Sequence, residues 1–142
     1  MAARRITVIL LALYTGLVLI ITMTPQGRAP GVINRVVNAV LDAVHGRGLL
    51  LWVDYSVVEF TANILMFVPL GVLVALLVAR RLRWILFVVG TAFSTAIELT
   101  QTVIPGRVPD VRDVMANSAG FLLGAAIVLA LRQGRKGRSR AE

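Results

Sequence analysis

The stretch FTANILMFVPLGVLVALLVA, residues 60–79, runs for twenty residues without a charge. At 1.5 Å per residue, an α-helix of this length reaches about 30 Å, which is the thickness of the hydrocarbon core of a bilayer. Lipid offers no hydrogen-bond partners to peptide groups, so a run that crosses it must be helical. This stretch therefore predicts a membrane-spanning helix.

Three further runs of similar length accompany it. Residues 6–23 and 114–131 carry no charge, and residues 84–104 carry one, Glu98. Of the 142 residues, 58% are hydrophobic and 15% are charged, whereas soluble domains have about 25% charged residues. The sequence predicts an all-α membrane protein, a four-transmembrane-helix bundle that forms a single domain over residues 1–142.

The basic residues indicate the orientation of the bundle. Ten of the fifteen fall on one side of the alternating spans: Arg4, Arg5, Arg80, Arg81, Arg83, Arg132, Arg135, Lys136, Arg138 and Arg140. Basic loops stay in the cytoplasm, so we expect both termini there, with residues 132–142 as a basic tail. Such clusters bind anionic headgroups, which makes the lipid bilayer the expected partner rather than nucleic acid.

The long loop over residues 25–57 is expected outside, where its residues 32–44 have apolar positions at helical spacing. This helix is too short to span and suits the surface of the outer leaflet. It could pack on the bundle or cover a site. Trp52 and Tyr55 are expected at headgroup depth, and His45, the only histidine, at a solvated helix end.

The second span carries two local signals. Ser56 followed by Glu59 predicts a capping box at its start, which explains Glu59 structurally. Pro69 cannot donate a backbone hydrogen bond and clashes with the carbonyl of Leu65, so with Gly71 nearby a kink is expected. Another helix should then satisfy the freed carbonyl.

A set of polar residues falls at one depth, in the outer leaflet or just above it. An ionised Glu98 in a span costs at least about 2.5–3.5 kcal/mol, so it should face the bundle. Its companions come from three spans, and the polar set is Asn63, Glu98, Gln101, Arg107, Asp110, Asp113 and Asn117. The spacing predicts a common site. Structural alternatives exist, because the aspartates suit a helix start and the asparagines suit helix packing.

Small residues continue the same face of the fourth span toward its inner half. Ala116, Gly120 and Gly124 recur every four residues. This small-xxx-small pattern is typical of helices that approach a neighbour closely.

These positions resemble the VanZ-like family of membrane proteins. The resemblance covers about residues 56–131 and lies in Asn63-x3-Phe67-x-Pro69-x-Gly71, Glu98-x2-Gln101 and Arg107-x2-Asp110-x2-Asp113-x3-Asn117-x2-Gly120-x3-Gly124. Ser118 and the Met115-Ala116 pair depart from it, which affects packing more than chemistry. The resemblance implies a multi-pass protein of the bacterial inner (plasma) membrane, a role in the cell envelope, and a link to glycopeptide resistance, chiefly to teicoplanin.

Three functions are compatible with the polar set. The first is binding or modification of an outer-leaflet ligand, a lipid-linked cell-wall precursor or a lipoglycopeptide, with Arg107 and Arg112 engaging phosphate or carboxylate. The second is an enzyme in which Glu98, Asp110 and Asp113 share a proton or hold Mg²⁺ or Ca²⁺. The third is a small transporter subunit, for which the Gly120 face would permit a homodimer. No catalytic motif, resident metal or cofactor is expected.

Overall fold

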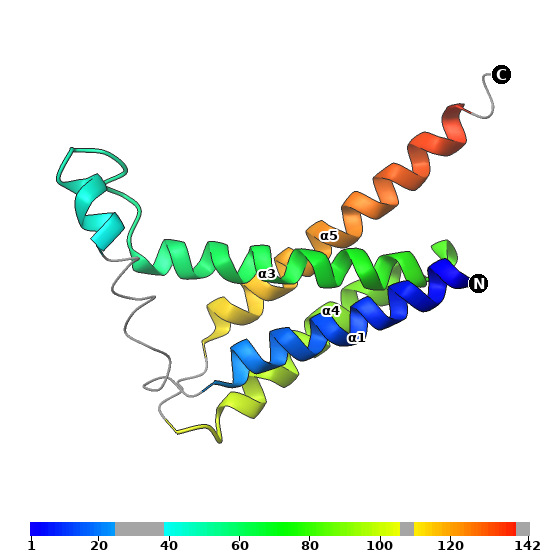
Figure 1. The fold of residues 1–142 in the computed structure, drawn as a ribbon, viewed down its shortest axis with the longest axis horizontal. Helices are drawn as coiled ribbons and strands as arrows, with labels where there is room; N and C mark the ends of the chain where they lie inside the picture. Colours follow the sequence, from blue (N-terminus) through cyan, green and yellow to red (C-terminus); the bar gives the residue numbers. More distant parts are fainter. Residues whose placement is uncertain (25–38, 106–109, 139–142) are drawn as a thin grey trace.

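Four long helices form the computed structural model, which describes residues 1–24, 39–105 and 110–138 (Figure 1). They are α1 (Ala2–Met23), α3 (Tyr55–Leu77), α4 (Trp84–Gln101) and α5 (Val111–Arg138), and a short 3-10 helix, η1 (Arg80–Leu82), joins α3 to α4. All four are long and apolar enough to cross a membrane. The predicted all-α fold with four candidate spans is confirmed. Helix α5 continues through residues 132–138, part of the expected tail.

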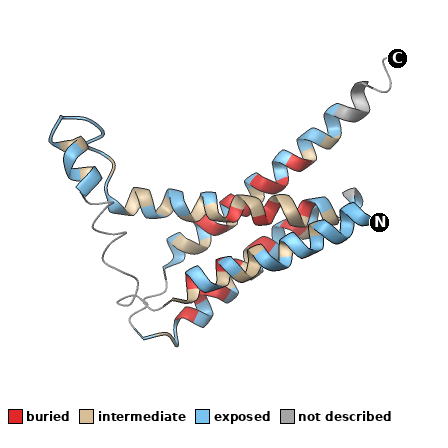
Figure 2. Cartoon of the chain, in the orientation of Figure 1, coloured by how far each residue is buried: buried red, intermediate tan, exposed pale blue. Residues whose placement is uncertain are grey.

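The helices pack in a ring around a small core. The most extensive contact joins α3 to α5, α4 packs on α5, and α1 lies against α3 and α4 (Figure 1). Figure 2 shows the buried residues concentrated where α3, α4 and α5 meet. Phe67, Phe121, Ile97 and Val18 are the largest fully buried apolar side chains. Most other apolar residues are exposed, as expected of side chains that face lipid.

The pairing of α3 with α5 depends on glycine. A Cβ atom added at Gly71 would overlap with the carbonyl oxygen of Phe121, because the two atoms would be closer than a van der Waals contact allows. A Cβ atom added at Gly124 would overlap with the carbonyl oxygen of Val68. Gly120 faces the carbonyl of Ile64 at similarly close range. The two backbones therefore touch directly, which only residues without a side chain allow.

Helix α3 continues through Pro69. The Tyr14 hydroxyl of α1 donates to the carbonyl oxygen of Met66 at 3.0 Å. That carbonyl is next to the one of Leu65, which Pro69 deprives of its N–H partner. A neighbouring helix thus supplies a donor at this point of α3, one residue from where we expected it, while the kink itself stays a prediction.

The start of α3 differs from the predicted capping box. Asp54 is the N-cap, and its Oδ1 accepts from the Val57 N–H at 2.9 Å and from the Ser56 hydroxyl at 2.8 Å. Ser56 is thus already within the helix, so the prediction that it caps α3 together with Glu59 is wrong. The hydrogen bonds from Val57 and then Ser56 lower the pKa of Asp54, because they favour the charged carboxylate.

The outer loop is described from residue 39 onward. Residues 39–45 are helical, as expected, and the rest of the predicted 32–44 helix lies outside the described residues. His45 is half-buried rather than solvated, since its Nε2 lies 3.1 Å from the Leu50 carbonyl and 2.9 Å from that of Val53. This bracing holds a turn in which Gly48 has φ +70°. Residues 49–52 are exposed, Trp52 to 72%.

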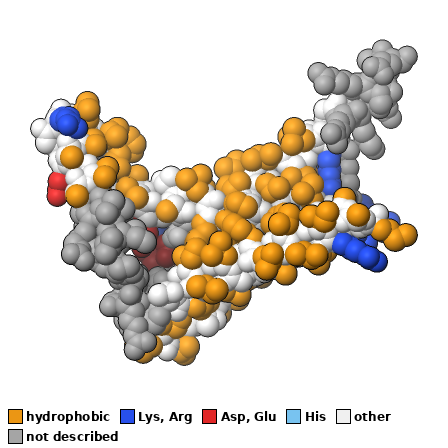
Figure 3. Space-filling view, viewed as in Figure 1, with side chains coloured by type: hydrophobic (Ala, Val, Ile, Leu, Met, Phe, Trp, Pro, Cys, Tyr) orange, Lys and Arg blue, Asp and Glu red, His pale blue; other side chains and the backbone are white. Residues whose placement is uncertain are grey.

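The two ends of the bundle differ in charge. Most of the Lys and Arg atoms in Figure 3 lie at the end that holds the N-terminus, and acidic atoms lie toward the other end. At the basic end, Arg132 of α5 donates to the carbonyl oxygens of Leu76 at 3.0 Å and Val78 at 3.3 Å. The last carbonyls of α3 have no partner within their own helix, and the C-terminus of a helix favours a cation. Arg132 therefore satisfies these carbonyls and stabilises this end of α3.

Candidate functional site

A direct hydrogen bond links α3 to α5 at the acidic end. Asn63 Nδ2 donates to Asp113 Oδ1 at 2.8 Å, and both side chains are half-buried. Asn63 lies two turns into α3, whereas Asp113 lies in the first turn of α5. A carboxylate in that turn also benefits from the positive end of the helix dipole. Residues fifty positions apart therefore meet, which the shared depth in the sequence predicted.

Glu98 connects α4 to the start of α5. It is 6% exposed, and its Oε2 accepts the backbone N–H of Asp110 at 3.0 Å. The Asp110 side chain itself is exposed, and its Oδ1 accepts the Arg112 N–H at 2.8 Å, as an N-cap does. Asp110 thus joins the polar set through its backbone, while its carboxylate has the capping role given above as the structural alternative.

Gln101 brings the first helix to the same place. Its Nε2 donates to the carbonyl oxygen of Thr22 at 2.8 Å, and Gln101 is 4% exposed. The Thr22 hydroxyl in turn donates to the Val18 carbonyl at 2.9 Å. The polar set thus draws on all four helices rather than on three.

Asn117 lies one turn deeper than Asp113 on the same face of α5. It is 2% exposed, and its Oδ1 meets no donor among the described residues. The Ser118 hydroxyl beside it is in the same state. A buried amide oxygen without a partner costs about 1–3 kcal/mol, so this part of the site calls for an explanation.

The remaining members of the set stand apart. Arg107 lies outside the described residues. Arg112, proposed with it as an anion contact, is exposed, and its guanidinium carbon lies 6.0 Å from the centre of the Phe60 ring. This geometry is that of a cation–π contact at the rim of the bundle.

Sequence reasoning missed Thr22 of α1, and Ser94 of α4 is a further buried polar residue beside the set. Ser94 is fully buried one turn below Glu98, and its hydroxyl donates to the Val114 carbonyl at 3.4 Å. The spacing of four residues from Glu98 was a usable signal for Ser94. Thr22 accepts the Gln101 hydrogen bond through its backbone carbonyl. Every residue has such a carbonyl, so the sequence could not identify this partner.

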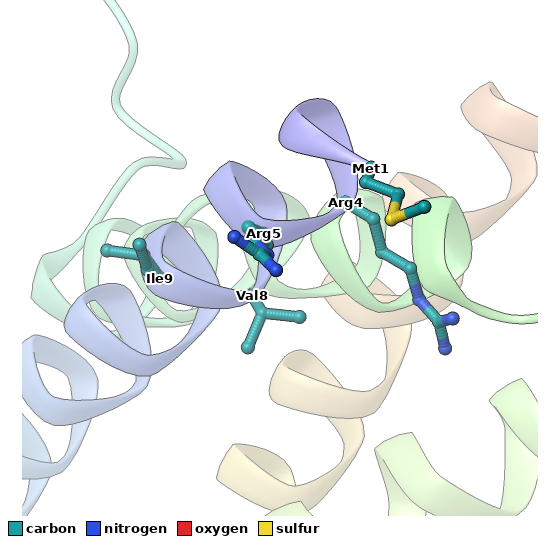
Figure 4. Close-up of a pocket in the computed structure, with 5 residues that line it drawn as sticks. All are labelled: Met1, Arg4, Arg5, Val8 and Ile9. Atoms are coloured by element: carbon teal, nitrogen blue, oxygen red, sulfur yellow. The ribbon is translucent and has the colours of Figure 1, made fainter.

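The chemistry of the described groups is that of a hydrogen-bonding site. Within residues 1–24, 39–105 and 110–138, no group of three or more His, Cys, Asp or Glu is placed to hold a metal ion. The pocket in Figure 4 is lined by Met1, Arg4, Arg5, Val8 and Ile9. These residues form the first turns of α1, at the opposite end from Thr22, so this pocket is separate from the polar site.

Comparison with known proteins identifies the family. No curated protein matches the chain, and no solved structure matches it. The family model described as VanZ/LLP1 matches residues 11–132, which includes every residue of the polar set. The chain therefore belongs to the VanZ/LLP1 family.

Proposed function

We propose that this protein binds, or modifies, a ligand of the bacterial cell envelope at the acidic end of its bundle, from the outer leaflet of the inner membrane. The observation that carries the proposal is the convergence of buried polar groups from four helices. Glu98, Gln101 and Asn117 are each at least nine-tenths buried there. Polar side chains within membrane spans cost free energy, so their presence in the bundle interior points to a function.

The charge distribution supports the outer leaflet as the side of access. Most of the described Lys and Arg atoms lie at the other end of the bundle, which the positive-inside rule assigns to the cytoplasm. Exposed Leu49, Leu50, Leu51 and Trp52 project from the loop before α3 at the acidic end. Apolar side chains with a tryptophan suit the headgroup region, so this loop would border the entrance from the membrane.

The proposed ligand class is a lipid-linked cell-wall precursor or a lipoglycopeptide such as teicoplanin. Both carry an apolar anchor that stays in lipid and a polar part that can reach the site. Arg112 at the rim is exposed and suits a phosphate or carboxylate of such a molecule. Resistance to teicoplanin is then the expected phenotype.

The test compares inhibitory concentrations of teicoplanin and vancomycin in a susceptible bacterium with and without the chain. We expect protection against teicoplanin that Asn63→Leu removes while the amount of membrane-inserted protein is unchanged. Thr100→Val is the matched control, because Thr100 is exposed and its hydroxyl donates to the carbonyl of Ala96 in its own helix. Equal concentrations with and without the chain would contradict the proposal.

The alternative function is that of an intramembrane enzyme. It is favoured by the presence in the site of two carboxylates from neighbouring helices, Glu98 and Asp113. The double variant Glu98→Gln with Asp113→Asn separates the two functions. Both amides can still accept the described hydrogen bonds from Asp110 and Asn63, but neither carries charge or a transferable proton. Retained protection would favour binding, whereas lost protection at normal protein level would favour carboxylate chemistry.

A further inference from the structure

The deepest part of the polar site has an acceptor without a donor. Asn117 Oδ1 is buried and meets no donor among the described residues. The described amide N–H bonds of the polar set go elsewhere, because Asn63 Nδ2 donates to Asp113 and Gln101 Nε2 donates to the Thr22 carbonyl. In a membrane interior, such an atom costs free energy unless something else donates to it.

We infer that Asn117 receives a hydrogen bond from the headgroup of a bound outer-leaflet lipid, and that the buried end of this headgroup is an uncharged hydroxyl or an ammonium. The inference rests on the proposed function, since it names the chemistry of the ligand at the same site. It concerns binding alone and includes no reaction step.

The surroundings of Asn117 argue against an anion at this depth. Asp113 lies one turn above it on the same helix, and Glu98 is buried beside the start of α5. A phosphate placed between these carboxylates would be repelled by like charge in a medium of low dielectric constant. The exposed guanidinium of Arg112 at the rim suits the phosphate better.

This arrangement orders the headgroup along the axis of the bundle. The phosphate would lie near the surface and the donor would extend inward to Asn117. Figure 3 shows acidic atoms toward this end of the bundle, away from the end that holds most of the basic atoms.

A series of phospholipids tests the inference without any mutation. Phosphatidylethanolamine, its N-methyl and N,N-dimethyl forms, and phosphatidylcholine share acyl chains and net charge, but the last has no N–H. We expect the purified wild-type protein to bind the first three at least roughly tenfold more tightly than phosphatidylcholine, because a hydrogen bond from a charged N–H is stronger than one between neutral groups. Native mass spectrometry with paired lipids measures this ratio. Equal binding of all four lipids would contradict the ammonium form of the donor.

Phosphatidylglycerol tests the hydroxyl form. We expect Asn117→Leu to abolish the preference for whichever lipid supplies the donor. We expect Asn117→Asp to retain it, because an aspartic side chain keeps an acceptor oxygen even when Asp113 and Glu98 hold it protonated. The control Gln133→Leu removes an exposed amide near the far end of α5 and should change nothing. If Asn117→Leu leaves the binding of phosphatidylethanolamine and phosphatidylglycerol unchanged, the inference is overturned.

These outcomes are separable from those of the resistance test. The lipid ratio is measured on purified protein and needs no antibiotic phenotype. A headgroup preference that depends on Asn117 would support the inference even in a strain whose teicoplanin susceptibility does not change. Teicoplanin protection without any headgroup preference would refute the inference and leave the proposed function standing.

Discussion

Asn63 and Asp113 form the contact at the residue scale that most directly joins two spans at the site. Interhelical hydrogen bonds in membrane proteins contribute about 0.6 kcal/mol on average, with larger values up to about 1.7 kcal/mol. We expect a double-mutant cycle of Asn63→Leu and Asp113→Leu to show a coupling energy of about 1 kcal/mol in the free energy of unfolding. Reversible unfolding in detergent measures it.

The control for this cycle is Thr61→Val combined with Asp113→Leu. Thr61 is exposed on α3, and its hydroxyl donates to the Val57 carbonyl of its own helix at 2.8 Å. This pair should show no coupling. Additive effects of Asn63→Leu and Asp113→Leu would instead mean that the 2.8 Å contact does not stabilise the bundle.

Asp54 makes the start of α3 sensitive to acid. Hydrogen bonds from Val57 and Ser56 lower its pKa in the folded chain below that of the unfolded chain. Its contribution to stability is therefore fully present above the unfolded pKa and is lost as pH falls through the folded pKa. We expect the free energy of unfolding to be constant above about pH 5 and to fall below about pH 4 by more in wild type than in Asp54→Asn.

The comparison works because asparagine is also a good N-cap but does not titrate. Thermal unfolding followed by circular dichroism at several pH values provides the measurement. Parallel pH profiles for wild type and Asp54→Asn would show that the cap makes no contribution that depends on protonation.

At the scale of elements, glycine decides how α3 and α5 pair. A Cβ atom at Gly124 would lie 2.0 Å from the Val68 carbonyl oxygen, so alanine there must push the helices apart. Overpacking of this kind typically costs about 1–3 kcal/mol. We expect Gly124→Ala and Gly71→Ala each to lower the free energy of unfolding by about 1–3 kcal/mol. Reversible unfolding in detergent measures this change.

Two other glycines provide matched controls. A Cβ atom at Gly16 of α1 or Gly134 of α5 would have nothing within 4 Å. Alanine at these positions should be neutral or should stabilise the helix by about 0.5–1 kcal/mol, because glycine is the poorer helix former. If all four substitutions behaved alike, close backbone contact could not be the reason for the glycines.

The elements also show what could be read from the sequence. Charge-free length is a local property, so all four candidate spans could be predicted, and the spacing of Ala116, Gly120 and Gly124 predicted a close partner. The cap of α3 was assigned wrongly because Asp54 and Ser56 are both capping residues, two positions apart. Only the three-dimensional arrangement shows that the Ser56 hydroxyl donates to the Asp54 carboxylate.

The candidate site was predictable to a similar extent. Polar residues at one depth predicted a common site, and the hydrogen bond between Asn63 and Asp113 joins two members of that set. The contact of Gln101 with Thr22 joins residues 79 positions apart through a backbone carbonyl, and no local pattern signals it. Likewise, Glu98 meets the backbone N–H of Asp110, a contact that no pattern of side chains signals.

For the whole molecule, the asymmetry of charge links fold to function. The site at the acidic end can serve an outer-leaflet ligand only if the basic end is cytoplasmic. The sequence has no cysteine, so single cysteines can report the orientation directly. Trp52 is exposed at the acidic end, and Arg81 and Gly134 are exposed at the basic end.

We expect a membrane-impermeant maleimide to label Trp52→Cys in cells whose inner membrane is intact. It should label Arg81→Cys and Gly134→Cys only after lysis, because moving the arginine-rich end across the membrane is disfavoured. Two basic-end positions guard against local shielding of one of them. The reverse pattern would turn the polar site toward the cytoplasm, and a ligand confined to the outer leaflet could then no longer reach Asn117.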